Sequence, residues 1–351
     1  MPAPTEIPSQ ISWFHDRPDS SFAPIPEAPY FDSALQAWVL SRYADVAAAL
    51  HSPSLLPVSL TGSESPAAIS NEEHRAMRAE TLAALPAPQL RLWRNQLLRH
   101  AEELLSQLPA DRPVDLLGEY ARPLCLSLAA TITRVQHDDP KKLCEHARAI
   151  SASSADPYNP SLRVPSKSAA AHLQPFFPPG PESLRRSGFV ALTQIMPALL
   201  GNTWFILLQH PHQWEHLHRH PRLIQPAIED LMRLSGLTRT LTRQATADIH
   251  LNGTDIRKGQ RVILRLIAAN KDPEVFDHPS ELNIARRTAK HLSFGAGPHA
   301  CTGAGLLRMI AAATTVPLLS RFAAAPLAHR VDWKGGATFL TPQSLWVHLH
   351  R

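Results

Sequence analysis

The chain has 351 residues, of which 44% are hydrophobic, enough for a sizeable core in one large domain or two ordinary ones. Its net charge of +5 is mild and scattered, without long Lys or Arg blocks, so the sequence argues against a nucleic-acid-binding protein. Cys125, Cys144 and Cys301 are spaced too widely for a disulfide framework or a zinc pattern, and no run of about eighteen apolar residues predicts a membrane span.

Residues 1–35 are rich in proline, and we expect them to be irregular. They carry no basic-then-apolar signal pattern, so we expect a cytoplasmic protein. A short strand is predicted at 37–40 and an alanine-rich helix at 43–51, which Pro53 stops. Residues 54–70 are predicted to form a loop. Because internal repeats and interdomain linkers are absent, we expect a single domain over 1–351.

His74 and Arg78 follow four residues apart in a predicted helix, so they share one face. Taken alone, this spacing is typical of an ordinary solvated face. Apolar residues then repeat at helical spacing from Leu90 to Leu105 and predict a core helix. On the same segment, three arginines form either a solvated face or a docking surface for an acidic electron-transfer partner: Arg91, Arg94 and Arg99.

Prolines at 157, 160, 165, 175, 178, 179 and 181 exclude long helices from residues 156–181. Residues 183–210 read as one long apolar helix, in which Pro197 frees the carbonyl of Thr193 and should kink the helix. The kink is either structural or shapes a pocket. Five histidines between 210 and 220 suggest a metal site, but no acidic or cysteine partner accompanies them, which favours a solvated helix.

The sequence after Thr238 alternates like a sheet, and Asn252-Gly253 between apolar runs predicts a hairpin. A last hairpin is predicted from residues 335–339 and 344–349. Between these hairpins lies the most specific pattern of the chain, Phe294-x-x-Gly297-x-x-x-Cys301-x-Gly303. Its glycines allow positive φ and a close approach of a flat ligand to the backbone.

This loop resembles the haem-binding loop of the cytochrome P450 family. Companion motifs in the family's order extend the resemblance from about Ala37 to the C-terminus, with the middle third poorly matched. The resemblance implies a mainly α fold with small β-sheets (α+β) and a single cytochrome P450-like domain, with a shortened and irregular lid at 156–181. It implies haem b as the cofactor and Cys301 as the axial ligand of the haem iron.

The resemblance also implies roles for residues outside the cysteine. Phe294 would shield the thiolate from water, and backbone N–H groups around Gly295 and Gly303 would tune it. The two haem propionates would be held by His74, Arg78, Arg243 and His299. A buried ion network would consist of Asp230, Arg233 and Arg286, with Asp where the family has glutamate. The substrate pocket would include Leu192, Met196, Thr238, Leu241, Thr338 and Phe339.

The central helix departs from the family pattern. The family's acid–threonine pair, which delivers protons to iron-bound oxygen, falls on Gln194 and Ile195, and neither side chain can do this work. Three hypotheses therefore remain open. The first is a monooxygenase that acts on a small organic molecule of secondary metabolism and receives electrons from a ferredoxin and a ferredoxin reductase. The second is a haem-thiolate enzyme that uses peroxide or rearranges its substrate. The third is a non-catalytic haem-binding accessory protein. In each case we expect a monomer without nucleic-acid or membrane partners.

Overall fold

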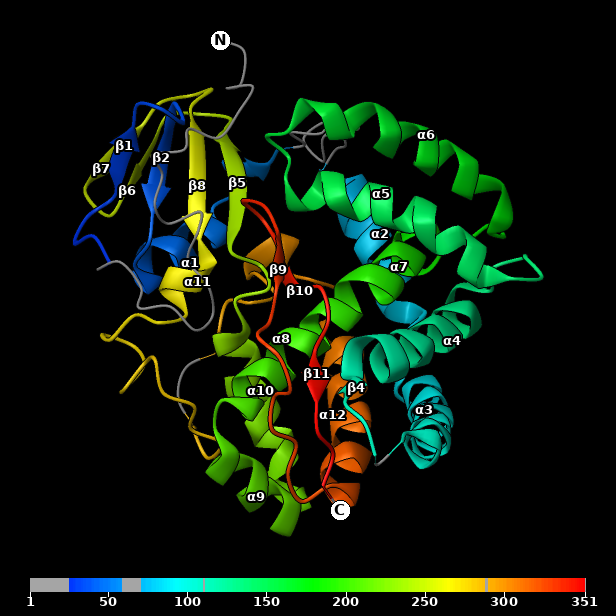
Figure 1. The fold of residues 1–351 in the computed structure, drawn as a ribbon. Helices are drawn as coiled ribbons and strands as arrows, with labels where there is room; N and C mark the ends of the chain where they lie inside the picture. The colour runs from blue at the N-terminus through cyan, green and yellow to red at the C-terminus, as the bar shows by residue number, and fades with distance from the viewer. Residues whose placement is uncertain (1–24, 59–70, 110, 288–289, 351) are drawn as a thin grey trace.

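The computed structural model describes residues 25–58, 71–109, 111–287 and 290–350 (Figure 1). A small sheet near the N-terminal end adjoins a larger helical body. The sheet has the order β1-β2-β8-β5-β3, in which β2 and β8 are parallel and the other neighbours are antiparallel. Its strands are β1 (Tyr30–Asp32), β2 (Ala37–Leu40), β3 (Leu55–Pro57), β5 (Thr240–Ala245) and β8 (Arg261–Arg265).

The expected irregular segment is partly wrong, because β1 lies inside residues 1–35 and pairs with β2. Residues 1–24 of that segment, and 59–70 of the expected loop, lie outside the described residues. The predicted strand at 37–40 and helix α1 (Tyr43–His51) are confirmed. The Asn252-Gly253 hairpin also forms between β6 (Ile249–Leu251) and β7 (Thr254–Ile256), with φ of 47° and 83° at its two turn residues. Both angles are positive, as a tight two-residue hairpin turn requires.

The helical body is built around one long helix. It consists of α7 (Arg186–Val190), a π-helical turn η8 (Ala191–Ile195) and α8 (Met196–Leu208). Packed around it are α3 (Ala87–Gln107), the π-helix η3 (Leu116–Ala121), α4 (Arg122–Thr133), α9 (Pro211–Arg219), α10 (Ile224–Ser235) and α12 (Ala304–Arg321). The segment 186–208 is apolar and long enough to cross a membrane, but 83% of its most apolar window is buried inside the fold, as in a core helix.

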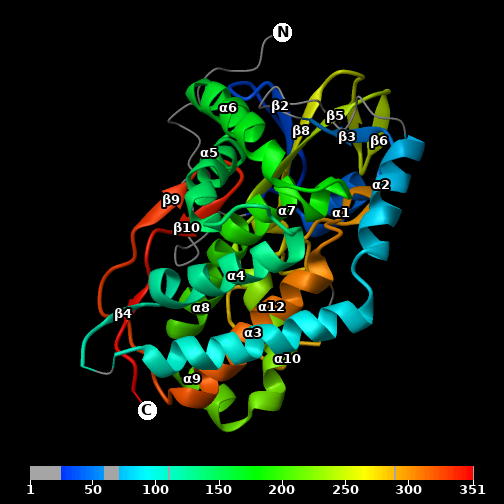
Figure 2. The ribbon, with the colours of Figure 1, turned by 90° about the vertical axis from the view of Figure 1, so that its right-hand side faces the viewer.

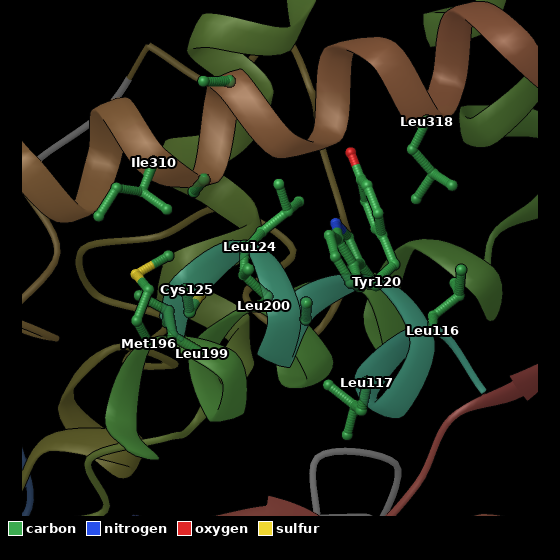
Figure 3. Packing of buried hydrophobic residues seen from close by; sticks show 14 of the residues in the cluster. Leu116, Leu117, Tyr120, Leu124, Cys125, Met196, Leu199, Leu200, Ile310 and Leu318 are labelled. Carbon is green, nitrogen blue, oxygen red and sulfur yellow. The ribbon is translucent and has the colours of Figure 1, made fainter. Parts of the chain in front are cut away.

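The core between α4, α8 and α12 is closely packed (Figure 3). Tyr120 stacks on Trp204 with ring centroids 5.7 Å apart, and its hydroxyl donates a hydrogen bond of 2.7 Å to the carbonyl of Thr314. Because both aromatic side chains are fully buried, this contact joins the central helix to α12 from the inside.

The π turn absorbs the proline that the sequence places in the central helix. Pro197 has no amide hydrogen, so the usual bond to the carbonyl of Thr193 cannot form. Instead of a sharp break, the backbone widens one residue earlier, where the N–H of Met196 reaches the carbonyl of Ala191. The expected interruption is therefore a π turn between α7 and α8.

Two helices lie side by side over one end of the central helix, α5 (Cys144–Ala155) and α6 (Arg163–Leu173) (Figure 1). The expectation that 156–181 is wholly irregular is wrong, because α6 forms inside it. Pro165 lies in the first turn of α6, where its missing N–H costs no hydrogen bond, and Pro175 follows the end of the helix. The two helices have 12 and 11 residues, and the expected shortening of this region stays a prediction.

The remaining elements complete the surface. Two more small sheets pair β9 (Trp333–Gly335) with β10 (Leu340–Pro342), and β4 (Val114–Asp115) with β11 (Trp346–Val347). The helix α2 (Asn71–Ala83) lies at the edge of the molecule (Figure 2). Short helical turns are α11 (Leu266–Ala269), η4 (Pro140–Leu143), η5 (Pro160–Leu162), η6 (Gln174–Phe176), η7 (Glu182–Leu184), η9 (Pro221–Leu223) and η10 (Gly297–His299).

We predict that Asn202→Ala lowers the free energy of unfolding by about 2–4 kcal/mol, because each buried carbonyl left without a donor costs about 1–3 kcal/mol. The fully buried Asn202 amide donates to the carbonyls of Ser235 and Leu340, both at 2.9 Å, and so ties α8 to α10 and β10. Urea unfolding measures the change, with the exposed Asn95→Ala as control. A loss equal to that of the control would contradict this role.

Candidate functional site

The glycine-rich loop before α12 is fixed by its own backbone and by α1. Gly295 and Gly297 have φ of 69° and 67°, the left-handed region that glycine adopts without strain. A Cβ atom on Gly297 would come within 2.4 Å of the carbonyl oxygen of Leu50 at the end of α1. The amide of Cys301 donates to the carbonyl of Phe294 at 2.9 Å and closes the loop. The geometry therefore needs the glycine that the motif supplies.

The Cys301 thiol lies at the N-terminus of α12. Burial raises its pKa, opposed by the N–H groups of Gly303 and Ala304 and by the charges of Arg78 and Arg308. The residue nevertheless keeps exposed surface. The two observations agree if the thiol faces a hollow that protein surrounds. One cavity of about 350 Å³ beside the loop is lined by Cys301 and by residues of α1, including Tyr43 and His51.

Phe294 and Arg308 contact each other on the side of the loop that faces α10. The Arg308 guanidinium lies 4.7 Å from the centroid of the Phe294 ring, and its Nε donates to Glu229 at 2.7 Å. Glu229 also lies 3.3 Å from His291. Burial would raise the pKa of Glu229, but hydrogen bonds from His291 and Arg308 outweigh it and lower the pKa to about 2. Sequence reasoning missed this role of Glu229, because only the fold brings residues 229, 291 and 308 together.

Two arginines and two histidines gather on the side of the loop that faces α2. The rings of His74 and His299 lie 4.3 Å apart, and Arg78 donates to the carbonyl of Ala300 at 2.6 Å. Burial together with His74, Arg243 and Arg78 lowers the pKa of His299 to about 4. Arg243 is 5% exposed, and burial lowers its pKa to about 10. We call His74, Arg78, Arg243 and His299 the cation cluster.

The cation cluster lacks an acidic counterpart among the described residues. The hydrogen bond that the structure gives to the Arg243 side chain goes to a backbone carbonyl, that of Thr242 at 3.1 Å. None of the influences on the pKa of His299 comes from a carboxylate. Burying an unneutralised guanidinium is unfavourable, so this arrangement calls for an anion between the four groups.

The predicted ion network forms. One Asp230 oxygen lies 2.6 Å from Arg233 and 2.8 Å from Arg286, while its other oxygen accepts the N–H of Asn283 at 2.7 Å. The shorter aspartate therefore still reaches both arginines. Arg233 also donates to the carbonyls of Asn270 and Pro279, so the network joins α10 to the strand-to-loop connection before Cys301.

Gln194 and Ile195 lie at the end of the π turn. The Gln194 amide points to the start of α5, where its nitrogen lies 3.5 Å from the carbonyl of Cys144, and it is also 3.3 Å from the Thr193 hydroxyl. That hydroxyl donates to the carbonyl of Phe189 at 2.7 Å. Ile195 packs partly against the core. No acid–alcohol pair stands at these two positions.

Four of the predicted pocket residues come together. Thr238 and Phe339 form a β-bridge, and the carbonyl of Thr338 accepts the N–H of Arg239 at 2.8 Å. With Leu241 on the same strand segment, these side chains are partly exposed. Leu192 is 3% exposed and offers little surface.

Met196 was wrongly predicted to line the pocket. Its side chain has 0% exposure. It packs in the core near Cys125 and Leu199 (Figure 3). The π turn rotates the helix at this point, which helical counting from sequence does not anticipate.

The arginines of α3 and the histidines of residues 210–220 both lie outside the Cys301 loop. Arg91, Arg94 and Arg99 are exposed on α3, opposite the buried Trp93 and Leu97. Among the described residues, no group of three or more His, Cys, Asp or Glu side chains could hold a metal ion, so the histidines of 210–220 form no such site. His210 and His218 instead lie against backbone carbonyls.

Comparisons with known proteins agree on one family. The family profile described as "Cytochrome P450" matches residues 209–345. The biotin biosynthesis cytochrome P450 of Bacillus subtilis is 26% identical, over 85% of this chain and 86% of that protein. The nocardicin C N-oxygenase of Nocardia uniformis is 26% identical, over 88% and 89%. A solved structure of P450BioI with an acyl carrier protein superposes with a TM-score of 0.80 at 24% identity, over 90% and 92%.

This chain belongs to the cytochrome P450 family. The expected mainly α fold with small sheets is confirmed, and the chain is an oxidoreductase of the monooxygenase class. Membership implies a haem cofactor. The residues fit this group: the Cys301 thiol can ligate iron, and the cation cluster beside its loop has no carboxylate partner of its own, whereas a haem carries two carboxylates. The non-catalytic hypothesis is not supported.

We predict that Asp230→Ala lowers the free energy of unfolding by about 3–5 kcal/mol, because it leaves two buried guanidinium groups without a counter-charge. The matched control is Asp248→Ala, whose exposed pair with Arg257 contributes no more than about 1 kcal/mol. Denaturant unfolding of both variants gives the comparison. Similar losses in the two variants would show that the buried network does not hold α10 to the loop.

Proposed function

We propose that this chain binds haem b through Cys301 as the axial ligand and oxidises a small organic metabolite with electrons from a ferredoxin-type partner. The single observation that carries the proposal is the cation cluster. It places four donors beside the Cys301 loop with no acid among the described residues, and a haem has two carboxylates on one edge. The arrangement thus matches both the iron ligand and the charged edge of the same group.

Each side chain then has a definite task. His74, Arg78, Arg243 and His299 bind the propionates through charge-assisted hydrogen bonds. The N–H groups of Gly303 and Ala304 stabilise the Cys301 thiolate. Phe294, held by Arg308 and Glu229, covers the sulfur on the side of α10. When bound, haem with a thiolate ligand supplies oxygen-activation chemistry.

The substrate would lie between the central helix and the hairpin of β9 and β10, which forms in place of the predicted pairing of 335–339 with 344–349. Thr238, Leu241, Thr338 and Phe339 supply a mixed polar and apolar wall, which suits a small molecule with few polar groups. Nocardicin C N-oxygenase and the biotin biosynthesis enzyme are named for small metabolites, which supports this substrate class.

A second candidate function is favoured by Gln194. An amide cannot gain and lose a proton near neutral pH, and the Gln194 side chain lies against the start of α5. An enzyme that takes peroxide, which already carries both oxygen atoms and two of the electrons, needs no such relay of protons. We therefore propose peroxide-supported oxidation as the alternative reaction.

The axial ligand is tested by spectroscopy. We predict that the reduced protein with carbon monoxide shows a strongly red-shifted Soret band, which disappears in Cys301→Ala because the thiolate is lost. Cys144→Ala serves as a matched control, since Cys144 lies on α5 and contacts its own helix turn. Persistence of the shifted band in Cys301→Ala would refute the ligand assignment.

The role of the central helix is tested by placing the family's acid and threonine at positions 194 and 195. We predict that Gln194→Glu with Ile195→Thr raises oxygen consumption from NADPH, ferredoxin and ferredoxin reductase by at least about tenfold, since a placed proton donor contributes about 10²–10⁴-fold in rate. Gln107→Glu, an exposed position on α3, is the control. An unchanged rate in a fully haem-loaded double variant would mean that proton delivery does not limit this protein.

A further inference from the structure

The helix α2 is attached to the body in an unusual way. Of its side chains from Glu72 to Ala83, Thr81 alone is buried, while Met77 is 50% and Leu82 53% exposed. In contrast, the neighbouring α3 buries four apolar side chains: Trp93, Leu97, Ala101 and Leu105. Most helices in proteins are held by a buried apolar face. In the described structure α2 buries no apolar side chain.

Polar contacts join α2 to the body at two places. At the first, His74 lies against His299 and Arg78 donates to the carbonyl of Ala300, so both side chains meet the Cys301 loop. At the second, the hydroxyls of Thr81 and Ser183 are 2.6 Å apart. Figure 2 shows α2 at the edge of the molecule, with α7 toward the centre.

The first attachment is unfavourable in the protein alone. The charges of Arg78 and Arg243 both act on His299 and disfavour its protonated form, and no carboxylate contributes to offset them. An anion with two carboxylates would turn this repulsion into attraction from both sides. The energy that docks α2 would then come from the cofactor rather than from buried apolar surface.

The second attachment leads to the central helix. Ser183 belongs to η7 (Glu182–Leu184), which runs directly into α7. A Cβ on Gly188 in α7 would lie 2.4 Å from the carbonyl oxygen of Ser183, so η7 and α7 are in close contact. Whatever holds Thr81 in place therefore also restrains the start of the helix that forms one wall of the pocket.

We propose that α2 is a strap fastened by the cofactor: it docks when the haem propionates neutralise the cation cluster, and its Thr81–Ser183 contact then holds the base of the central helix. The inference rests on the proposed haem site. It adds that cofactor loading, rather than folding of the chain alone, orders residues 71–83 and the turn at 182–188.

Hydrogen exchange followed by mass spectrometry tests the strap on the whole protein with and without haem. Amides of 71–83 exchange at least about tenfold faster without haem, whereas those of α3 (Ala87–Gln107) change by less than about twofold. Equal protection of 71–83 in the two forms, with haem incorporated, overturns the strap. Failure to incorporate haem at all refutes the proposed function instead.

Two variants keep the test decisive if the haem-free protein does not fold. In haem-loaded Arg78→Gln, exchange of 71–83 rises severalfold relative to α3. In haem-loaded Thr81→Val, exchange of 79–83 and 182–188 rises at least about threefold with an unchanged Soret band. The exposed Thr131→Val on α4 is the matched control. No rise in either variant overturns the strap.

Discussion

The site depends on positive charge that the protein does not neutralise itself. His74, Arg78, Arg243 and His299 come from three separate parts of the chain and meet beside one loop, with Arg243 almost fully buried. Burying the Arg243 guanidinium without a counter-charge opposes folding, and a bound anion would offset that cost, as the proposed haem site requires. This constraint connects the position of α2, the course of β5 and the geometry of the Cys301 loop.

The opposite side of the loop is held by charges that are fully paired. Asp230 lies between Arg233 and Arg286. Glu229 accepts hydrogen bonds from Arg308 and His291. Both acids stand next to each other on α10, one directed into the core and one toward the loop. The protein thus fixes the loop with paired charges on one face and leaves unpaired charges on the other face, where a ligand with two carboxylates fits.

Local signals predicted much of this site, because its motifs are short and rigid. The glycines around Cys301, the i, i+3 pair at 230 and 233 and the Asn252-Gly253 turn each depend on backbone geometry that neighbouring residues determine. The predictions from sequence failed where contacts between residues distant in the chain determine the structure. The π turn at Ala191–Ile195 rotates Met196 into the core, and the first-turn position of Pro165 lets α6 form. Glu229 gained a partner that lies 79 positions away in sequence.

The central claim is that the cation cluster exists to bind the two carboxylates of the cofactor. The most direct measurement compares the affinity of the haem-free protein for haem and for haem dimethyl ester, which has the same iron and ring but no charged propionates. Charge-assisted hydrogen bonds contribute about 1.5–3 kcal/mol each, so haem should bind at least about a hundredfold more tightly. Equal affinities for the two compounds would contradict the account.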